Sequence, residues 1–148
     1  MTSPQMTQAL QTCTEAIHKV APDSVGAMLI FSLVSVEEQQ DIYRFQCETA
    51  MWMRNVNGTL HGGICATAVD QAMGFVVHCI QPGKGISPTV EMQLSYHRPI
   101  IPGQKLDILV QVMSRGKHLM HLRAEARMAG SDKLCVSATG VYSFISAK

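Results

Sequence analysis

Several features that define specialised protein classes are scarce or absent in this sequence of 148 residues. The formal net charge is only +1, so we expect no binding to nucleic acid and no attraction to an acidic membrane surface. The first residues lack the charged start and apolar run of a signal peptide, and no apolar run reaches membrane-spanning length. We therefore expect a cytoplasmic protein without membrane insertion. Neither a P-loop nor a Rossmann fingerprint is present, so any bound nucleotide would lie on the surface.

Cysteine and histidine are present without the spacing that disulfide scaffolds or metal sites need. The five cysteines are odd in number and include no Cys-x-x-Cys pair, which favours free thiols in a reducing compartment. No pair of histidines stands beside Asp, Glu or Cys at the spacing of metal ligands, so we expect no metal. The cysteines are Cys13, Cys47, Cys65, Cys79 and Cys135.

The apolar residues that are present suffice for one folded domain. The length and the hydrophobic content of 47% predict a single domain over residues 1–148. Within a helical segment at residues 1–24, apolar residues recur at helical spacing from 5 to 20, and Pro22 ends this first predicted helix. Alternating apolar residues predict strands on both sides of the middle of the chain. These strands are expected at 27–36, 43–50, 90–97, 106–112, 120–128 and 134–144.

A long apolar helix is predicted between the two groups of strands. Residues 64–80 are apolar on nearly every side, which is typical of a buried helix, and the stop signal Pro82-Gly83 follows. Short turns between the last four strands predict an antiparallel meander. The pattern as a whole predicts an α+β fold: a curled antiparallel sheet of five to six strands wraps around one long central helix, and the N-terminal helix covers part of the sheet.

Asp70 is the most informative residue of the predicted central helix. It is the only formal charge between Asn55 and Gly83. A carboxylate in an apolar setting is costly unless it is paired or neutral, so Asp70 is a candidate general base or, less readily, a nucleophile. The structural alternative is an acid that is bonded to Ser or Thr hydroxyls and contributes only to stability.

The segment His61-Gly62-Gly63 precedes this helix. The first amides of a helix have no internal acceptor and carry the positive end of the helix dipole. Glycines at this place leave the amides accessible, so the helix start can hold an oxyanion or a polarised carbonyl oxygen. Asp70 follows Gly62 by eight residues, or about 12 Å along the axis, so one extended substrate or two subunits can reach both.

These residues together carry a family resemblance. The pattern of Asn55, Gly58, His61-Gly62-Gly63 and Asp70 resembles the hotdog-fold acyl-CoA thioesterases of the PaaI-like (phenylacetate-pathway) type. The resemblance extends from about Val25 to Phe144. It implies the hotdog fold and hydrolysis of acyl-CoA to a carboxylic acid and CoA, without a metal or cofactor.

The resemblance also implies roles for individual residues. Asp70 would activate water, while the Gly62 N–H and the Asn55 side-chain amide would contact the thioester oxygen. Thr89 falls where the family places a hydroxyl that helps hold the attacking water. His61 would orient the loop more than transfer protons. Gly63 is a further substrate-binding candidate. Independently of the resemblance, Arg98, Arg115 and Lys117 are candidates for contacts with CoA phosphates, because cationic side chains suit phosphate, although each is first of all an ordinary strand-end or turn charge.

The resemblance further implies a homodimer or a dimer of dimers. We expect the strand from Thr89 to His97 to pair with its symmetry mate, because an exposed sheet edge must be covered or paired. Asn55 and Gly62 of one chain would then face Asp70 and Thr89 of the other. The alternative function is a non-catalytic binder of acyl-CoA or another acyl ligand. A related dehydratase is a third reading, which the arrangement of His61 and Asp70 does not fit.

Overall fold

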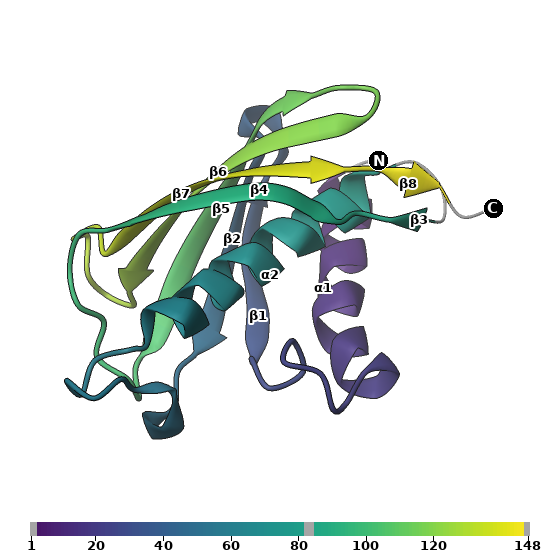
Figure 1. Ribbon diagram of the computed structural model, residues 1–148. Helices are drawn as coiled ribbons and strands as arrows, with labels where there is room; N and C mark the ends of the chain where they lie inside the picture. Colours follow the sequence, from purple (N-terminus) through teal and green to yellow (C-terminus); the bar gives the residue numbers. More distant parts are fainter. Residues whose placement is uncertain (1–2, 82–84, 147–148) are drawn as a thin grey trace.

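The computed structural model of the protein describes residues 3–81 and 85–146, in which it has two α-helices, two short 3-10 helices and a six-stranded antiparallel sheet. The sheet curves over α2, and α1 lies beside the C-terminal part of α2 (Figure 1). This arrangement confirms the predicted sheet around a central helix. The elements are α1 (Ser3–Val20), β1 (Phe31–Glu37), β2 (Ile42–Glu48), α2 (Gly62–Ile80), β4 (Thr89–Tyr96), β5 (Lys105–Arg115), β6 (Leu119–Met128) and β7 (Val136–Ser143). A small second sheet pairs β3 (Gly85–Ile86) with β8 (Ile145–Ser146).

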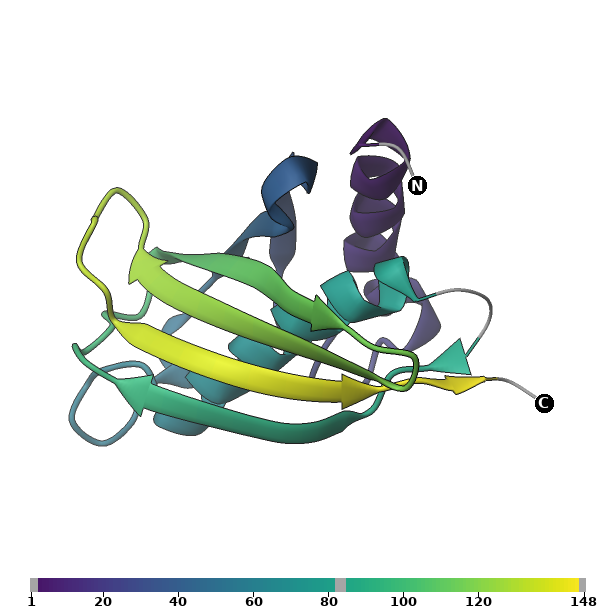
Figure 2. The same ribbon diagram turned by 90° about the horizontal axis from the view of Figure 1, so that it is seen from above.

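The order of the strands differs from the predicted meander. The six strands lie in the order β1-β2-β5-β6-β7-β4, so only β5, β6 and β7 form a meander and β4 occupies an edge beside β7 (Figure 2). The segment between β4 and β5 is not a hairpin. Its Ile100 carbonyl accepts from the Leu60 N–H at 2.8 Å, and its Gly103 N–H donates to Thr49 Oγ1 at 3.0 Å. Alternation specifies the buried face of a strand, but it leaves the neighbouring strand open.

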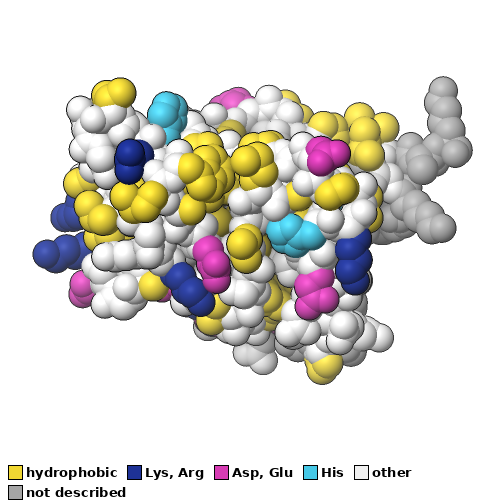
Figure 3. Space-filling model, turned by 90° about the horizontal axis from the view of Figure 1, so that it is seen from below, with side chains coloured by type: hydrophobic (Ala, Val, Ile, Leu, Met, Phe, Trp, Pro, Cys, Tyr) yellow, Lys and Arg dark blue, Asp and Glu magenta, His cyan; other side chains and the backbone are white. Residues whose placement is uncertain are grey.

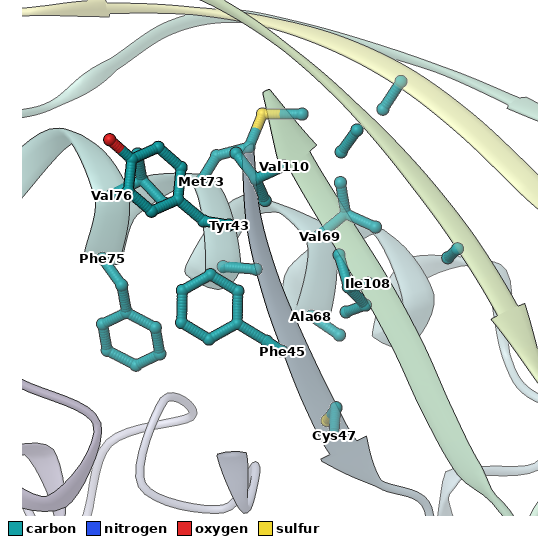
Figure 4. Close-up of a cluster of buried hydrophobic side chains, with 14 of the residues drawn as sticks. Tyr43, Phe45, Cys47, Ala68, Val69, Met73, Phe75, Val76, Ile108 and Val110 are labelled. Carbon is teal, nitrogen blue, oxygen red and sulfur yellow. The ribbon is translucent and has the colours of Figure 1, made fainter. Parts of the chain in front are cut away.

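The core lies between one side of α2 and the concave face of the sheet. Figure 4 shows α2 side chains such as Val69, Met73 and Val76 against residues of β2 and β5. Each such large apolar side chain contributes about 1.5–3 kcal/mol when fully buried. Gly140 on β7 makes room for Met73, because a Cβ at Gly140 would lie 2.7 Å from the Met73 sulfur. Nine residues of α2 are buried: Cys65, Ala68, Val69, Ala72, Met73, Phe75, Val76, Val77 and Cys79.

The opposite side of α2 is not covered by the sheet, although the sequence predicted a helix buried nearly all round. Residues spaced three and four apart form one stripe of partly or fully exposed positions on it. We call this stripe the open face of α2; it consists of Gly63, Thr67, Asp70, Gly74 and His78. In contrast to the expectation from sequence, α2 is long and apolar enough to span a membrane, but half of this stretch is buried inside the protein. It begins at Gly62, two residues before the predicted start, and the expected stop at Pro82-Gly83 lies outside the described residues.

The exposed surface is mixed in character. The side opposite to that of Figure 2 shows hydrophobic side chains near its middle, with acidic and basic side chains scattered around them (Figure 3). No single sign of charge dominates this side, as the small net charge predicts. The edge strand β4 is exposed or half-buried along its whole length and carries Val90 and Tyr96 at 59% and 54% exposure.

Candidate active site

In the middle of α2, the carboxylate of Asp70 meets two hydroxyl side chains from the sheet. We call these three residues the carboxylate cluster: Asp70, Thr89 and Tyr142. Oδ1 of Asp70 accepts a hydrogen bond from Thr89 Oγ1 at 2.8 Å and from the Tyr142 hydroxyl at 2.7 Å. The Tyr142 hydroxyl also lies 3.1 Å from the backbone oxygen of Asp70. Thr89 and Tyr142 are directly paired residues of β4 and β7. The strand pairing therefore places both donors over one carboxylate oxygen.

The two oxygens of Asp70 have different surroundings. Oδ1 is held by two hydroxyls, whereas Oδ2 has no hydrogen-bond partner within residues 3–81 and 85–146. Asp70 itself is half-buried, so the second oxygen can reach a water or a ligand. The anchored oxygen fixes the orientation of the free one.

Tyr142 is suited to act as a permanent donor. Its side chain is buried, and the burial raises the pKa of its hydroxyl well above the ordinary value of a tyrosine. The hydrogen bond to Asp70 and the negative charge of Asp70 raise this pKa further, while the Thr89 hydroxyl opposes them. The hydroxyl therefore keeps its proton at neutral pH and donates to the carboxylate.

The N-terminal end of α2 holds a second cluster, built around a backbone amide. We call it the amide cluster: Asn55, His61, Gly62 and Tyr96. His61 is the N-cap, and its Nδ1 accepts from the Gly63 N–H at 3.0 Å. The Gly62 N–H, in contrast, has no acceptor in the described part of the chain. The Tyr96 hydroxyl donates to the Gly62 carbonyl oxygen at 2.7 Å, so β4 holds this first turn in place.

Asn55 organises the loop before the helix. Its Oδ1 accepts from the N–H groups of Asn57 at 2.9 Å and Thr59 at 3.2 Å, and its Nδ2 donates to Thr59 Oγ1 at 2.9 Å. The loop turns at Gly58, which has a φ of 80°. The side chain of Asn55 thus has a structural task, and the second hydrogen of its Nδ2 is the one that can reach a substrate.

A cavity of about 340 Å³ brings part of the amide cluster together with a predicted cation. Asn55, Gly62, Tyr96 and Arg98 line it, and the Arg98 guanidinium donates to the Leu134 carbonyl oxygen at 2.8 Å. A second cavity of similar size lies elsewhere on the sheet and includes none of these residues. The cavity at the start of α2 therefore combines an unpaired amide with a nearby positive charge.

The other two predicted phosphate ligands lie away from this cavity. Arg115 forms an ion pair with Asp41. The strand register places Arg115 in the same cross-strand row as Tyr142 and Thr89, far from the cavity at the start of α2. Lys117 is exposed in the turn after β5. The three cations that the sequence offered for CoA thus do not form one group within a single chain.

The two clusters are also apart within one chain. Gly62 and Asp70 are separated by eight residues of helix, which corresponds to about 12 Å. Asn55 and Gly62 share one cavity, and Asp70 and Thr89 share a hydrogen bond. No group of three His, Cys, Asp or Glu side chains arranged for a metal ion occurs among the described residues, and all five cysteines are unpaired.

Sequence reasoning did not single out the two tyrosines that hold these clusters. Tyr96 and Tyr142 were read only as members of the alternating apolar rows of their strands. One signal was available. A tyrosine hydroxyl on an apolar strand face needs a hydrogen-bond partner, and the predicted central helix has few polar groups that could serve as that partner. Their partners, Gly62 and Asp70, become visible only when the strands are placed against the helix.

Comparison with known proteins gives two findings from sequence. A family model described as the thioesterase superfamily matches residues 57–135, a range that contains all of α2 and all of β4. The mouse protein named acyl-coenzyme A thioesterase 13 is 32% identical over 132 residues, covering 87% of this chain and 89% of the mouse protein.

Two solved structures have a similar fold at low sequence identity. The PaaI protein from the phenylacetic acid degradation operon of Escherichia coli aligns with a TM-score of 0.78 at 18% identity, over 99% of this chain and 97% of that chain. A Streptococcus mutans protein bound to acetyl CoA aligns with a TM-score of 0.68 at 19% identity, over 80% of this chain and 90% of that chain. These likenesses confirm the predicted hotdog fold.

Proposed function

The chain belongs to the thioesterase superfamily, and we propose that it hydrolyses acyl-CoA thioesters with Asp70 as the general base. Membership makes the protein a thioester hydrolase. An acyl-CoA substrate is supported by the name of the mouse relative and by the acetyl CoA in the Streptococcus mutans protein.

The observation that carries the proposal is that the two carboxylate oxygens of Asp70 differ in their hydrogen bonding. Oδ1 is held by Thr89 and Tyr142, and Oδ2 is left to accept a proton. Oδ2 takes a proton from a water as that water attacks the thioester carbonyl carbon. The Thr89 hydroxyl donates to Oδ1, and its own lone pairs can accept the second hydrogen of the same water. Attack gives a tetrahedral intermediate, which collapses with cleavage of the carbon–sulfur bond. The departing CoA thiolate takes up a proton, and Asp70 gives up the one on Oδ2, which restores its carboxylate.

The Gly62 N–H is the proposed contact for the carbonyl oxygen, since it points out of the helix start without an acceptor of its own. Negative charge develops on that oxygen during attack, and a fixed donor in such a position contributes about 2.7–4 kcal/mol to the transition state. The remaining hydrogen of Asn55 Nδ2 is a second donor, and Arg98 in the same cavity is the proposed contact for a CoA phosphate.

The two clusters would meet across a subunit interface. Within one chain they are about 12 Å apart along α2, and a thioester group is much smaller than that separation. The edge strand β4 is exposed and pairs only with β7 among the described residues, so its outer backbone edge is available to pair with its symmetry mate. A two-fold axis at β4 would place Gly62 and Asn55 of one protomer near Asp70 and Thr89 of the other. We propose a homodimer, alone or as half of a dimer of dimers.

A mixing experiment tests the shared site. Asp70→Asn chains and Gly62→Pro chains, each of which loses most of its activity alone, are denatured together and refolded as a mixture. If the site is shared, half of the dimers are mixed and each mixed dimer has one intact site, which restores about a quarter of wild-type activity. If both groups of one site come from one chain, the mixture has only the mean of the two residual activities, and the proposed subunit arrangement is wrong.

Thiol release from a panel of acyl-CoAs, followed with a thiol reagent, tests the activity itself. Turnover that is lost in Asp70→Asn supports the proposal. Tight binding of acyl-CoA with no thiol release from wild-type protein would instead favour the non-catalytic binder.

A further inference from the structure

Gly74 lies in the interior of α2, on the open face, one turn after Asp70. A glycine inside a helix lowers stability relative to alanine. A Cβ at Gly74 would meet no heavy atom of the described residues within 4 Å, whereas a Cβ at Gly140 would collide with Met73. Packing within the chain therefore gives no reason for a glycine at this position. Something outside the chain that approaches the helix closely would give one.

An apolar groove of about 400 Å³ runs over Gly74. Its floor is α2 from Gln71 to His78, one wall is α1, and the other wall is β3 with Ser87. In the sequence, Gln71 directly follows Asp70 and Ser87 comes two residues before Thr89, so the groove begins next to the carboxylate cluster. The lining is mainly aliphatic and aromatic, with Cys13, Ala16, Ile17, Phe75 and Ile86 among its members. The groove therefore has the character of a site for a hydrocarbon chain that starts at Asp70.

We propose that this groove holds the acyl chain of the thioester substrate and that Gly74 is the point at which the chain crosses the helix. The proposal rests on the proposed function and specifies its substrate class. From Gln71 to His78 the floor spans seven residues, or about 10 Å. An extended polypeptide has three backbone bonds per residue and spans about 3.3–3.6 Å per residue. An extended acyl chain has a similar length per bond, so about 10 Å corresponds to eight or nine carbon–carbon bonds. The groove therefore fits a medium-length acyl chain of about eight to ten carbons.

Chain-length dependence of kcat/KM is the direct measurement. Each methylene that enters the groove should raise kcat/KM by about fourfold, and the gain should stop once the chain passes His78 and reaches solvent. Wild-type protein should thus show a rise from butanoyl-CoA to octanoyl- or decanoyl-CoA and a plateau beyond. A profile that is flat, or that rises without a break to hexadecanoyl-CoA, would overturn the proposal.

Gly74→Leu should fill the groove. We expect kcat/KM to fall by about 10- to 100-fold for decanoyl-CoA and by less than about threefold for acetyl-CoA, because the loss scales with the methylenes that are displaced. Gly74→Ala, which adds one methyl group where the acyl chain crosses, should lower kcat/KM for decanoyl-CoA by a smaller factor of about fourfold and raise the melting temperature. An equal loss for all chain lengths, or a changed oligomeric state by light scattering, would show that Gly74 serves a subunit contact instead.

A second variant guards against distortion of α2. Ala16→Phe narrows the groove from the α1 wall, and Gln11→Phe places the same ring on an exposed position of α1 as the matched control. The first should shorten the preferred chain and the second should not. If both behave like wild type while chain length still matters, the acyl chain lies elsewhere.

Binding separates this proposal from the hydrolytic one. Calorimetric titration of Asp70→Asn protein, which keeps the substrate intact, should give tighter binding for decanoyl-CoA than for free CoA, and adding Gly74→Leu should remove most of that difference without weakening CoA. This result would support the groove even if no thiol were released, in which case only the hydrolytic function fails. Equal affinity for decanoyl-CoA and CoA, together with measurable turnover, would overturn the groove and leave hydrolysis standing.

Discussion

The middle of α2 and its N-terminal end are built in different ways. At the carboxylate cluster, two strands from distant parts of the sequence place hydroxyls on one oxygen of Asp70. At the amide cluster, the active group is the backbone N–H of Gly62, which any helix start leaves unpaired. The first depends on tertiary packing and the second on local structure. The base should therefore be the more sensitive to changes in the sheet, whereas the oxyanion contact depends on the sheet through the Tyr96 hydroxyl that holds the Gly62 carbonyl.

The largest expected effect is at the base. Asp70→Asn keeps the shape of the side chain and an acceptor oxygen for Thr89 and Tyr142, but it removes the basicity. We expect kcat to fall by about 100- to 10,000-fold, the range for a positioned general base, with little change in acyl-CoA affinity or melting temperature. The measurements are thiol release and thermal unfolding on one preparation, with Asp23→Asn, an exposed acid, as the control. A variant that melts earlier but turns over normally would make Asp70 a purely structural residue.

The second effect is at the amide. Gly62 is the first helical residue, where proline is well tolerated, and His61 has a ψ of 130° that suits a residue before proline. Gly62→Pro therefore removes the N–H with little change in the fold. Loss of one donor costs about 1.4–4 kcal/mol, so kcat should fall by about 10- to 1,000-fold.

Gly62→Ala is the matched control for that variant, since it adds a Cβ at 3.4 Å from the Tyr96 ring and keeps the N–H. It should retain kcat within a few-fold. If alanine and proline lose activity equally, crowding of Tyr96 is the cause and the amide is not the oxyanion contact.

The third effect tests how far the base depends on the sheet. Thr89→Val keeps the shape and strand preference of the residue but removes the hydroxyl that holds Asp70 Oδ1. We expect about a tenfold loss of kcat, since Tyr142 still anchors the carboxylate and a bond to a charged group is worth about 1.5–3 kcal/mol. Thr89→Ser keeps the hydroxyl and should stay near wild type. A serine variant as impaired as the valine variant would point to strand packing instead.

The smallest effect is on alkaline stability. Burial raises the pKa of the Tyr142 hydroxyl in the folded state. As pH rises above about 10, the hydroxyl therefore loses its proton in the unfolded chain before it does so in the folded protein. The free energy of unfolding decreases over this range. The stabilisation that Tyr142 provides over Phe should be complete below about pH 10 and decrease above it. Tyr96→Phe should show a smaller change of the same sign, because Tyr96 is 54% exposed although burial raises its pKa too.

Denaturant unfolding of wild type and both variants from pH 7 to 11 measures this difference. The buried thiols of Cys47 and Cys65, whose pKa burial raises to about 12, contribute equally to wild type and Tyr142→Phe and cancel in that comparison. A gap between wild type and Tyr142→Phe that is constant with pH would mean that the hydroxyl is not the group that loses its proton.

Local patterns in the sequence predicted the elements well. Helical spacing predicted α1, and period-two alternation predicted every strand of the large sheet, because both periods follow directly from backbone geometry. Asp70 was identified as a lone charge in an apolar helix, and Gly62 as an amide at a helix start. Neither conclusion needs knowledge of any other element.

Only the tertiary structure decided what surrounds these groups. The position of β4 beside β7 puts Thr89 and Tyr142 on the same oxygen of Asp70, and a meander order would have separated them. The open face of α2, with the groove over Gly74, exists because the sheet curls around one side of the helix and stops. Strand order and the extent of curling depend on contacts between distant residues, which no local pattern contains. The sequence thus determined which groups can react, and the packing of the sheet on α2 decided how they are held.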